Sequence, residues 1–176
     1  MKNLFFSLPL LLLAWWLYVP PPPSPTFQPP AAARLEQQVS QERYTRRLAQ
    51  ETVVARRVFK RNHCRPDYAE LVARYALENG LSTRVLAGLI FVESSCRPGA
   101  VSKSHCYGLT QVSPRTWKYP VRDLLNPELN VQIGAKILAG YVHRYGLREG
   151  LHAYNGFGDP TDGYARKVLT AAGYQV

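Results

Sequence analysis

The sequence predicts a mainly α protein: one helical domain over residues 62–176 with a small loop or hairpin lobe, preceded by an apolar helix, a proline-rich linker and a polar helix. Two observations lead to this prediction. Apolar residues recur three and four positions apart through most of the domain, as they do on the buried face of an α-helix. Glycine, proline, serine and asparagine stand where these patterns begin or end, as helix starts and stops require. A chain of 176 residues is long enough for one such domain and an extension.

The N-terminal segment, residues 1–19, predicts a signal anchor or a signal peptide. Lys2 precedes Leu4 to Val19, an uncharged run that would span roughly 24 Å as a helix. Aromatic residues at its far end suit a membrane interface, and the nearest run of small residues, at 31–33, is too distant for signal cleavage. We therefore favour an uncleaved anchor in the inner membrane over a cleaved signal. Either route places the rest of the chain outside the cytoplasm, in the periplasm or beyond.

Residues 20–61 are expected to separate this segment from the domain. Prolines dominate residues 20–30, which predicts a semi-rigid polyproline II linker of roughly 34 Å. Residues 31–61 predict one basic polar helix whose apolar pairs are too few for a coiled coil. Such a helix suits a stalk, a docking element or a basic segment at a membrane surface.

The basic charge is concentrated ahead of the domain. The formal net charge is +10, and residues 34–65 hold nine arginine or lysine residues against three glutamates. A basic surface suits an anionic partner such as a cell-wall polymer, a lipid head group or nucleic acid, and it equally suits solubility. Nucleic acid is not expected as a partner, because the sequence has no zinc-finger spacing, aromatic RNP run or basic-zipper heptads.

One acidic residue of the domain stands in an apolar setting. Ser82 is a suitable N-cap for a helix whose apolar side includes Leu86 and Leu89. Glu93 follows these two leucines by seven and four positions, so its carboxylate is expected on or beside the buried face. Burial would raise its pKa, and a carboxyl that stays protonated near neutral pH can donate a proton to a leaving oxygen. The alternative is a glutamate at a fraying helix end, satisfied by backbone or water.

Caps and apolar spacing predict the remaining elements of the domain. Asn126 and Pro127 form a strong start for a helix that ends near Gly146. The buried row expected along this helix is Leu129, Ile133, Ile137 and Tyr141. Further helices are expected at 66–80, 109–112, 148–154 and 163–172, the last with Asp162 as N-cap, and a loop with a short hairpin at 96–107.

Several blocks of the domain, in this order along the chain, resemble the catalytic domain of the lytic transglycosylases, a lysozyme-like family related to goose-type lysozyme. The blocks lie between residues 67 and 172 and are Glu93-Ser94, Ser102, Gly108-Leu109-Thr110-Gln111, Asn126-Pro127 with Asn130, Ala153-Tyr154-Asn155, and Tyr164. The resemblance implies an α+β lysozyme-like fold and activity on peptidoglycan. The chain departs from the family at Thr110, where methionine is usual, at Cys96, and at His105-Cys106, positions that bear on the groove floor.

The resemblance also implies a role for each matching side chain. Glu93 would be the catalytic acid. Hydrogen bonds to the glycan or its N-acetyl groups would come from Ser102, Gln111 and Asn155. Tyr154 would line the sugar groove, and Tyr164 would orient Glu93.

The predicted enzyme is a peptidoglycan lytic transglycosylase, which needs one carboxylate where ordinary glycosidases use two. The other acidic residues of the domain stand at helix starts and turns. The substrate's own C6 hydroxyl would attack the anomeric carbon, so Glu93 would act as acid and then as base at the MurNAc-GlcNAc β-1,4 bond and leave a 1,6-anhydromuramic end. Its use would be local opening or remodelling of a cell wall. Two alternatives stay open: a water-using muramidase with Asp159 or Asp162 placing the water, and an inactive glycan-binding scaffold of an envelope-spanning machine.

Histidines and cysteines complete the reactive side chains. No metal or organic cofactor is expected, because the four histidines lack metal-ligand spacing. Cys64, Cys96 and Cys106 allow one disulfide in an oxidising compartment, with three possible pairings. We favour Cys96 with Cys106, which would stiffen the loop after Glu93, and the alternative is that all three are free.

Overall fold

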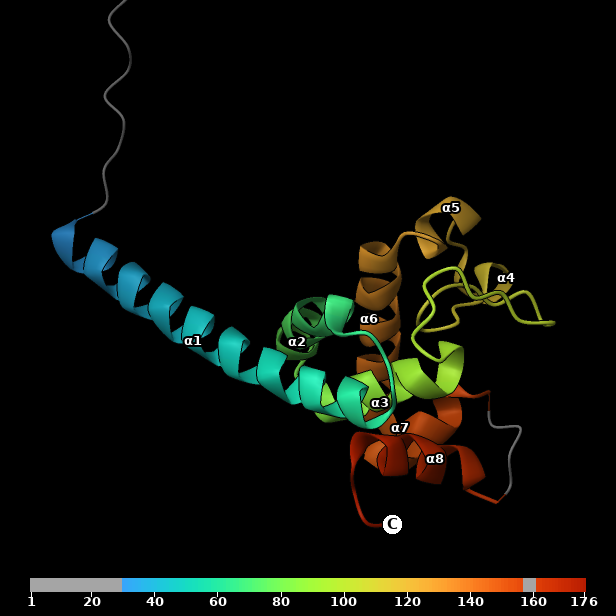
Figure 1. The fold of residues 1–176 in the computed structure, drawn as a ribbon. Helices are drawn as coiled ribbons and strands as arrows, with labels where there is room; N and C mark the ends of the chain where they lie inside the picture. Colours follow the sequence, from blue (N-terminus) through green and yellow to red (C-terminus); the bar gives the residue numbers. More distant parts are fainter. Residues whose placement is uncertain (1–29, 157–160) are drawn as a thin grey trace, which may run out of the picture. The chain divides into compact units, whose positions relative to one another are not determined.

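The computed structural model describes residues 30–156 and 161–176, and their fold is helical (Figure 1). The elements in chain order are α1 (Ala31–Arg61), the 3-10 turn η3 (Pro66–Tyr68), α2 (Ala69–Glu78), α3 (Thr83–Ser94), α4 (Pro114–Trp117), α5 (Val121–Leu124), α6 (Pro127–Tyr145), α7 (Leu147–Tyr154) and α8 (Gly163–Ala172). Within these residues β pairing is limited to two isolated antiparallel bridges, Val101 with Tyr107 and Tyr107 with Val112. The predicted mainly α fold is confirmed, and the expected hairpin lobe is reduced to these bridges.

The predicted membrane segment at 1–19 lies outside the described residues, as does the proline-rich linker apart from Pro30. In the part of the chain that the structure describes, no helix combines the length and the apolar character needed to cross a bilayer. The anchor and the linker therefore stay predictions.

Helix α1 has the bounds predicted for the polar helix, and its C-terminal end is part of the folded domain. The compact unit of the chain runs from Val39 to Val176, and the residues before it form a unit of their own. Ala55, Val58 and Phe59 are at most 2% exposed and belong to the main hydrophobic core. The domain therefore begins before residue 62, because three apolar residues at helical spacing are enough to bury one side of the last turns of α1.

Helix α3 is the most buried helix of this unit, and it packs against α2 and α8 (Figure 1). Gly88 permits the contact with α8, since a Cβ atom there would meet the carbonyl oxygen of Val168 at 2.7 Å and the backbone nitrogen of Ala172 at 2.8 Å. Further along α3, Glu93 meets Tyr164 at the start of α8. The two helices therefore run antiparallel, and the end of α3 lies beside the beginning of α8.

The segment predicted as a short helix at 109–112 is a turn, so that prediction is wrong. Gly108 and Gln111 have left-handed backbone conformations, with φ of 78° and 49°. Asn130 of α6 holds the turn: its side-chain oxygen accepts from the backbone N–H of Thr110 at 2.8 Å, and its amide donates to two backbone carbonyls at 2.8 and 2.9 Å. These long-range bonds take the place of helical ones, which a local apolar pattern does not reveal. The short helices α4 and α5 that follow were not predicted.

Helix α6 begins as predicted. The side-chain oxygen of Asn126 accepts from the backbone N–H groups of Glu128 and Leu129 at 3.0 and 3.1 Å. The predicted buried row is only partly right, because Ile133 is 8% exposed but Leu129 is 37% exposed. The side of α6 that is fully buried carries Val131, Gly134, Ala135 and Leu138. Small residues let neighbouring segments approach this side closely, and the search for large apolar residues overlooked them.

The other predicted helices are present near their expected bounds, as η3 with α2, as α7 and as α8. Asp162 occupies the N-cap position of α8, but its side chain makes no cap hydrogen bond and instead pairs with Arg148. Ser82 likewise occupies the N-cap position of α3 without a side-chain cap bond.

The disulfide joins Cys64 to Cys96, so the favoured pairing of Cys96 with Cys106 is wrong. Cys96 follows α3 in a left-handed conformation, with φ of 61°, and the bridge ties it to the segment after α1. Cys106 is a half-buried free thiol. Backbone hydrogen bonds hold the later part of this loop, where the N–H of Ser102 donates to the carbonyl of Cys106 at 3.0 Å. The disulfide therefore stiffens the end of the helix that carries Glu93.

Candidate active site

Glu93 lies in the last turn of α3, where the buried helix reaches the surface. Its preceding turn, with Leu89 and Ile90, is fully buried, whereas Glu93 itself is only partly covered. Ser95 ends the helix in a left-handed conformation, with φ of 50°. The carboxyl is thus held by a rigid, buried helix at the edge of solvent.

Tyr164 contacts this carboxyl directly. Its hydroxyl donates to Oε1 of Glu93, and the tyrosine is 8% exposed at the start of α8. The antiparallel packing of α3 and α8 places the two side chains opposite each other. The predicted orientation of Glu93 by Tyr164 therefore has a direct geometric basis.

Burial raises the pKa of Glu93 from 4.5 to about 7, and the hydrogen bond from Tyr164 opposes this rise only in part. Desolvation disfavours the carboxylate more than a single hydroxyl donor stabilises it. Burial and the nearby Glu93 charge raise the pKa of Tyr164 and of Tyr154 well above the ordinary value, so both phenols stay protonated. Near neutral pH, Glu93 is poised between its acid and base forms, as the sequence predicted.

A cavity of about 510 Å³ opens beside Glu93. It contains two more of the predicted site residues, Ser102 and Gln111, together with Arg97, which was not predicted. The Arg97 guanidinium donates through Nε to the carbonyl of Ser94 at 3.2 Å, which fixes a positive charge near the end of α3. Among the described residues, Glu93 is the only carboxylate that lines this cavity.

Gln111 is oriented by two backbone carbonyls. Its Nε2 donates to Gly108 at 2.8 Å and to Ala100 at 3.1 Å. Because both partners are acceptors, the amide nitrogen must face them, and Oε1 is the atom left to accept from a ligand. The Ser102 Oγ accepts from the backbone N–H of Cys106 at 3.0 Å, which leaves its own proton for donation. The two side chains thus offer the cavity one acceptor and one donor.

A second cavity, of about 190 Å³, shares Gln111 with the first. Tyr154 and Asn155, the remaining predicted residues, line it together with Trp117 and Tyr141. The Tyr154 hydroxyl donates to the backbone carbonyl of Thr110 at 2.8 Å. Tyr154 therefore holds the turn next to Gln111, and its ring faces the cavity. Because Gln111 borders both cavities, they are adjacent, and we call the two together the Glu93 groove.

Two residues of α6 that the sequence did not single out as functional support this groove. Asn130 is 0% exposed and accepts from the Thr110 hydroxyl as well as from its backbone. At Gly134 a Cβ atom would lie 2.3 Å from Oγ1 of Thr110, so α6 and the turn are in direct contact. The sequence did contain one signal for this interaction, an asparagine four residues after the helix cap at Asn126. The sequence did not reveal that the hydrogen-bond partner of this asparagine is Thr110.

The other carboxylates have different surroundings. Asp162 pairs with Arg148, and Glu128 pairs with Arg74 at 3.2 Å. Asp159 lies outside the described residues. Within the described residues there is also no group of three or more His, Cys, Asp or Glu side chains that suits a metal ion.

Comparison with known proteins assigns this arrangement to a family. The model of the transglycosylase SLT domain family matches residues 70–170. A protein named transglycosylase, from Enterobacteria phage PRD1, is 32% identical over 108 residues, which cover 57% of this chain and 41% of that protein. The X-ray structure of an inactive glutamate-to-glutamine mutant of lytic transglycosylase Slt from Pseudomonas aeruginosa matches with a TM-score of 0.53 and 20% identity, over 60% of this chain and 23% of that one.

This chain spans less than half the length of both relatives, and the likeness to the solved structure concerns the fold. The family match is the broader finding, since it covers more than half of the chain and includes α3, the turn at Gly108 to Gln111, α6 and α7. The chain belongs to the transglycosylase SLT domain family.

Proposed function

We propose that this chain is a peptidoglycan lytic transglycosylase that cleaves the β-1,4 bond between MurNAc and GlcNAc. The observation that carries the proposal is Glu93, a carboxyl with a pKa of about 7 beside a cavity lined by hydrogen-bonding groups. Family membership supplies the class of reaction. The inactive glutamate-to-glutamine mutant of the Pseudomonas aeruginosa relative is consistent with an essential glutamate in such a domain.

In the first step, protonated Glu93 donates its proton to the glycosidic oxygen, and the bond from this oxygen to the anomeric carbon of MurNAc breaks. A pKa near the working pH suits this role, because the acid is populated and its proton is readily transferred. Because the Tyr164 hydroxyl donates to Oε1, we assign the transferred proton to Oε2 of Glu93. The leaving sugar departs with the proton from Glu93.

In the second step, the Glu93 carboxylate takes the proton of the C6 hydroxyl on the same MurNAc. The C6 oxygen forms a bond to the anomeric carbon, and the product carries a 1,6-anhydro ring. Glu93 is then protonated again, so the cycle needs neither water nor a second carboxylate. This fits the absence of another carboxylate from the cavity walls in the described residues.

The polar groups around the cavity suit binding of an N-acetylated glycan. Gln111 offers an acceptor, and Ser102 offers a donor, to the cavity that Glu93 also lines. Asn155 adds an exposed amide in the neighbouring cavity. An N-acetyl group presents one N–H and one carbonyl, so it can pair with both kinds of group.

We also propose that the enzyme acts at a cell envelope, is held at the inner membrane by its N-terminal segment, and opens the wall locally for an envelope-spanning machine. The support is the uncharged Leu4 to Val19 run with Lys2 ahead of it. Fractionation of cells that express the full chain tests this part. Recovery from membranes, resistant to carbonate, is expected, and a mature N-terminus at or after Pro20 would contradict an uncleaved anchor.

Mass spectrometry of digested peptidoglycan tests the reaction. Fragments with 1,6-anhydromuramic ends are expected, and Glu93→Gln should lower their rate of formation by about 10²- to 10⁴-fold. Reducing ends, which are heavier by one water, would instead identify a water-using muramidase. If neither product forms but the protein binds glycan strands, the chain is a binding scaffold and the proposal fails.

A further inference from the structure

The part of α1 that belongs to the compact unit, from Val39 to Arg61, has a buried side and an exposed side. The buried side carries core residues such as Ala55 and Phe59. On the opposite side, exposed residues follow one another at alternating steps of four and three positions, which helical geometry places in one stripe. We call this set the outer stripe: Val39, Arg43, Arg46, Gln50, Val53, Arg57 and Lys60.

Positive charge dominates the outer stripe. Four of its seven residues are arginine or lysine, and none is acidic. Over residues 39–61 seven arginines or lysines stand against two glutamates. One of these, Glu42, pairs with Arg46 at 3.7 Å in an exposed contact, and the other, Glu51, is half-buried on another side of the helix. The stripe therefore presents a net positive charge to solvent.

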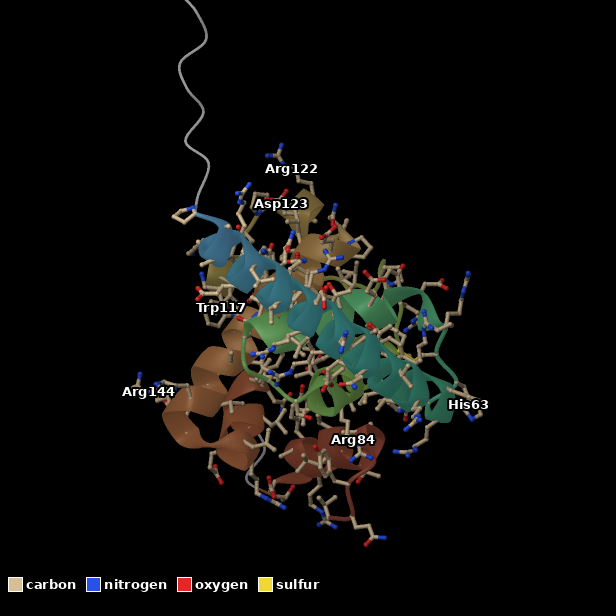
Figure 2. All side chains as sticks on the ribbon, turned by 90° about the vertical axis from the view of Figure 1, so that its left-hand side faces the viewer. His63, Arg84, Trp117, Arg122, Asp123 and Arg144 are labelled. Carbon is tan, nitrogen blue, oxygen red and sulfur yellow. A yellow bond between two sulfur atoms is a disulfide. The ribbon has the colours of Figure 1, made fainter. Side chains whose placement is uncertain are left out.

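The outer stripe is open along its whole length. Figure 2 shows α1 lying across the front of the domain, with its outer side toward the viewer and its last turn beside His63. Val39 and Val53 are 39% and 43% exposed. Two valines among four cations are too few to pack against a partner helix, which needs apolar residues at most of these positions. A negatively charged surface suits the stripe better.

The chain ahead of α1 indicates which negatively charged surface lies within reach. The uncharged run from Leu4 to Val19 is the proposed membrane segment, and the linker predicted after it spans roughly 34 Å. A tether of this length keeps α1 at a high local concentration beside lipid head groups. Each lysine or arginine near an anionic layer of head groups adds to the attraction, and exposed valines on the same side suit the boundary with the acyl chains.

We propose that the outer stripe of α1 lies on the anionic phospholipid surface of the membrane that holds the N-terminal segment. This inference rests on the proposed anchoring, and it adds an electrostatic contact that orients the domain on the membrane. In Figure 1, α4, which contributes Trp117 to the second cavity, lies on the other side of α6 from α1. Contact through the outer stripe therefore leaves the Glu93 groove open to the cell wall.

Hydrogen exchange of the full chain in lipid nanodiscs tests the proposal. One set of discs holds phosphatidylcholine alone, and the other holds equal parts of phosphatidylcholine and phosphatidylglycerol, which is anionic. Residues 39–51 report the contact, because they form the largely exposed part of α1 and their amides exchange without unfolding of the core. Their exchange is expected to slow roughly fivefold or more in the anionic discs at low salt, and high salt should reverse this slowing.

Two variants with equal net charge separate the outer stripe from the charge of the whole chain. In the stripe variant the four cations of the stripe become glutamine, which retains helical propensity. The control variant replaces four exposed cations outside α1 by glutamine: Arg84, Arg115, Arg122 and Lys136. The stripe variant should exchange at the same rate in both kinds of disc, whereas the control variant should keep the slowing. Circular dichroism melts confirm that both variants are folded.

Each other outcome decides a different part of the inference. Equal exchange of the unmodified chain in both kinds of disc would overturn the proposal, and so would slowing that persists in the stripe variant. Slowing by purified peptidoglycan strands, without slowing in the anionic discs, would assign the stripe to the wall instead. A chain that inserts into neither kind of disc would contradict the proposed anchor alone. Flotation with preformed vesicles of the same two compositions then decides the stripe, since binding to anionic vesicles that the stripe variant loses supports the contact and no binding overturns it.

Discussion

Replacement of Glu93 by glutamine is expected to stabilise the protein at neutral pH. The folded-state pKa of about 7 lies above the ordinary value of 4.5. Below pH 4.5 both states of the chain hold this proton, so Glu93 contributes no pH dependence. As the pH rises from 4.5 toward 7 the unfolded chain releases the proton and the folded chain retains it, which favours unfolding. Above about pH 7 both states are ionised, and the cost stays constant.

The size of this cost follows from the same two pKa values. At pH 7 the separation between 4.5 and about 7 corresponds to roughly 3 kcal/mol of lost stability. Glutamine has nearly the same shape, and its amide oxygen can accept the Tyr164 hydroxyl in place of Oε1. Glu93→Gln should therefore raise the free energy of unfolding by up to about 3 kcal/mol at pH 7 and by about zero at pH 4. For a domain of this size the gain corresponds to roughly 6 to 12 °C in the melting temperature.

Thermal melts of both proteins at pH 4 and pH 7 measure this difference. Glu78→Gln is the control, because Glu78 is an exposed residue at the end of α2. The Glu78→Gln variant should have the same melting temperature as the unmodified protein at both pH values. A Glu93→Gln variant that is no more stable than the unmodified protein at pH 7 would refute the reasoning. Hydrogen bonds to the ionised carboxylate would then outweigh its burial, and Glu93 would not be protonated in the free enzyme.

Three further outcomes are expected. Tyr164→Phe removes the hydrogen bond that lowers the pKa of Glu93, so the alkaline limb of the kcat/KM profile should move to higher pH. Gly134→Ala should destabilise the domain in urea by about 1–3 kcal/mol through its clash with Thr110, whereas Gly140→Ala should not destabilise it. Replacing Cys64 and Cys96 together with serine should lower the unfolding free energy by about 3.5 kcal/mol and abolish the effect of a reductant on urea melts.

Local signals predicted the helices and the acid from the sequence. Asn126 and Pro127 start α6 through bonds to residues two and three positions away, and such a signal is fully contained in the sequence. The burial of Glu93 could be predicted because helical periodicity relates it to Leu86 and Leu89 on the same helix. Family motifs then predicted five further site residues, and the structure places them at the two neighbouring cavities and at the carboxyl of Glu93, while their roles stay predictions.

Long-range contacts account for what the sequence did not predict. The turn before Gln111 depends on Asn130, which is 20 residues from its partner Thr110, so its local apolar pattern suggested a helix. The disulfide joins cysteines 32 residues apart, and the pairing depends on the segment after α1 lying next to the end of α3. Arg97 lines the cavity after the left-handed conformations of Ser95 and Cys96 have ended α3. Each of these features requires knowing which segments meet in space.

Helix α6 fixes the distance between the turn that carries Gln111 and a cavity near the C-terminal end of the helix. Asn130 near its start fixes the turn that carries Gln111, and Arg144 near its end lines a cavity together with Trp117 and Tyr145. Fourteen residues at 1.5 Å each separate them by about 21 Å along one rigid axis. A residue inserted between Asn130 and Arg144 would rotate Arg144 by about 100° about the helix axis, away from its place in the cavity wall. One helix therefore fixes both the turn that carries Gln111 and the wall of that cavity, so a change in the length of α6 would alter their relative positions.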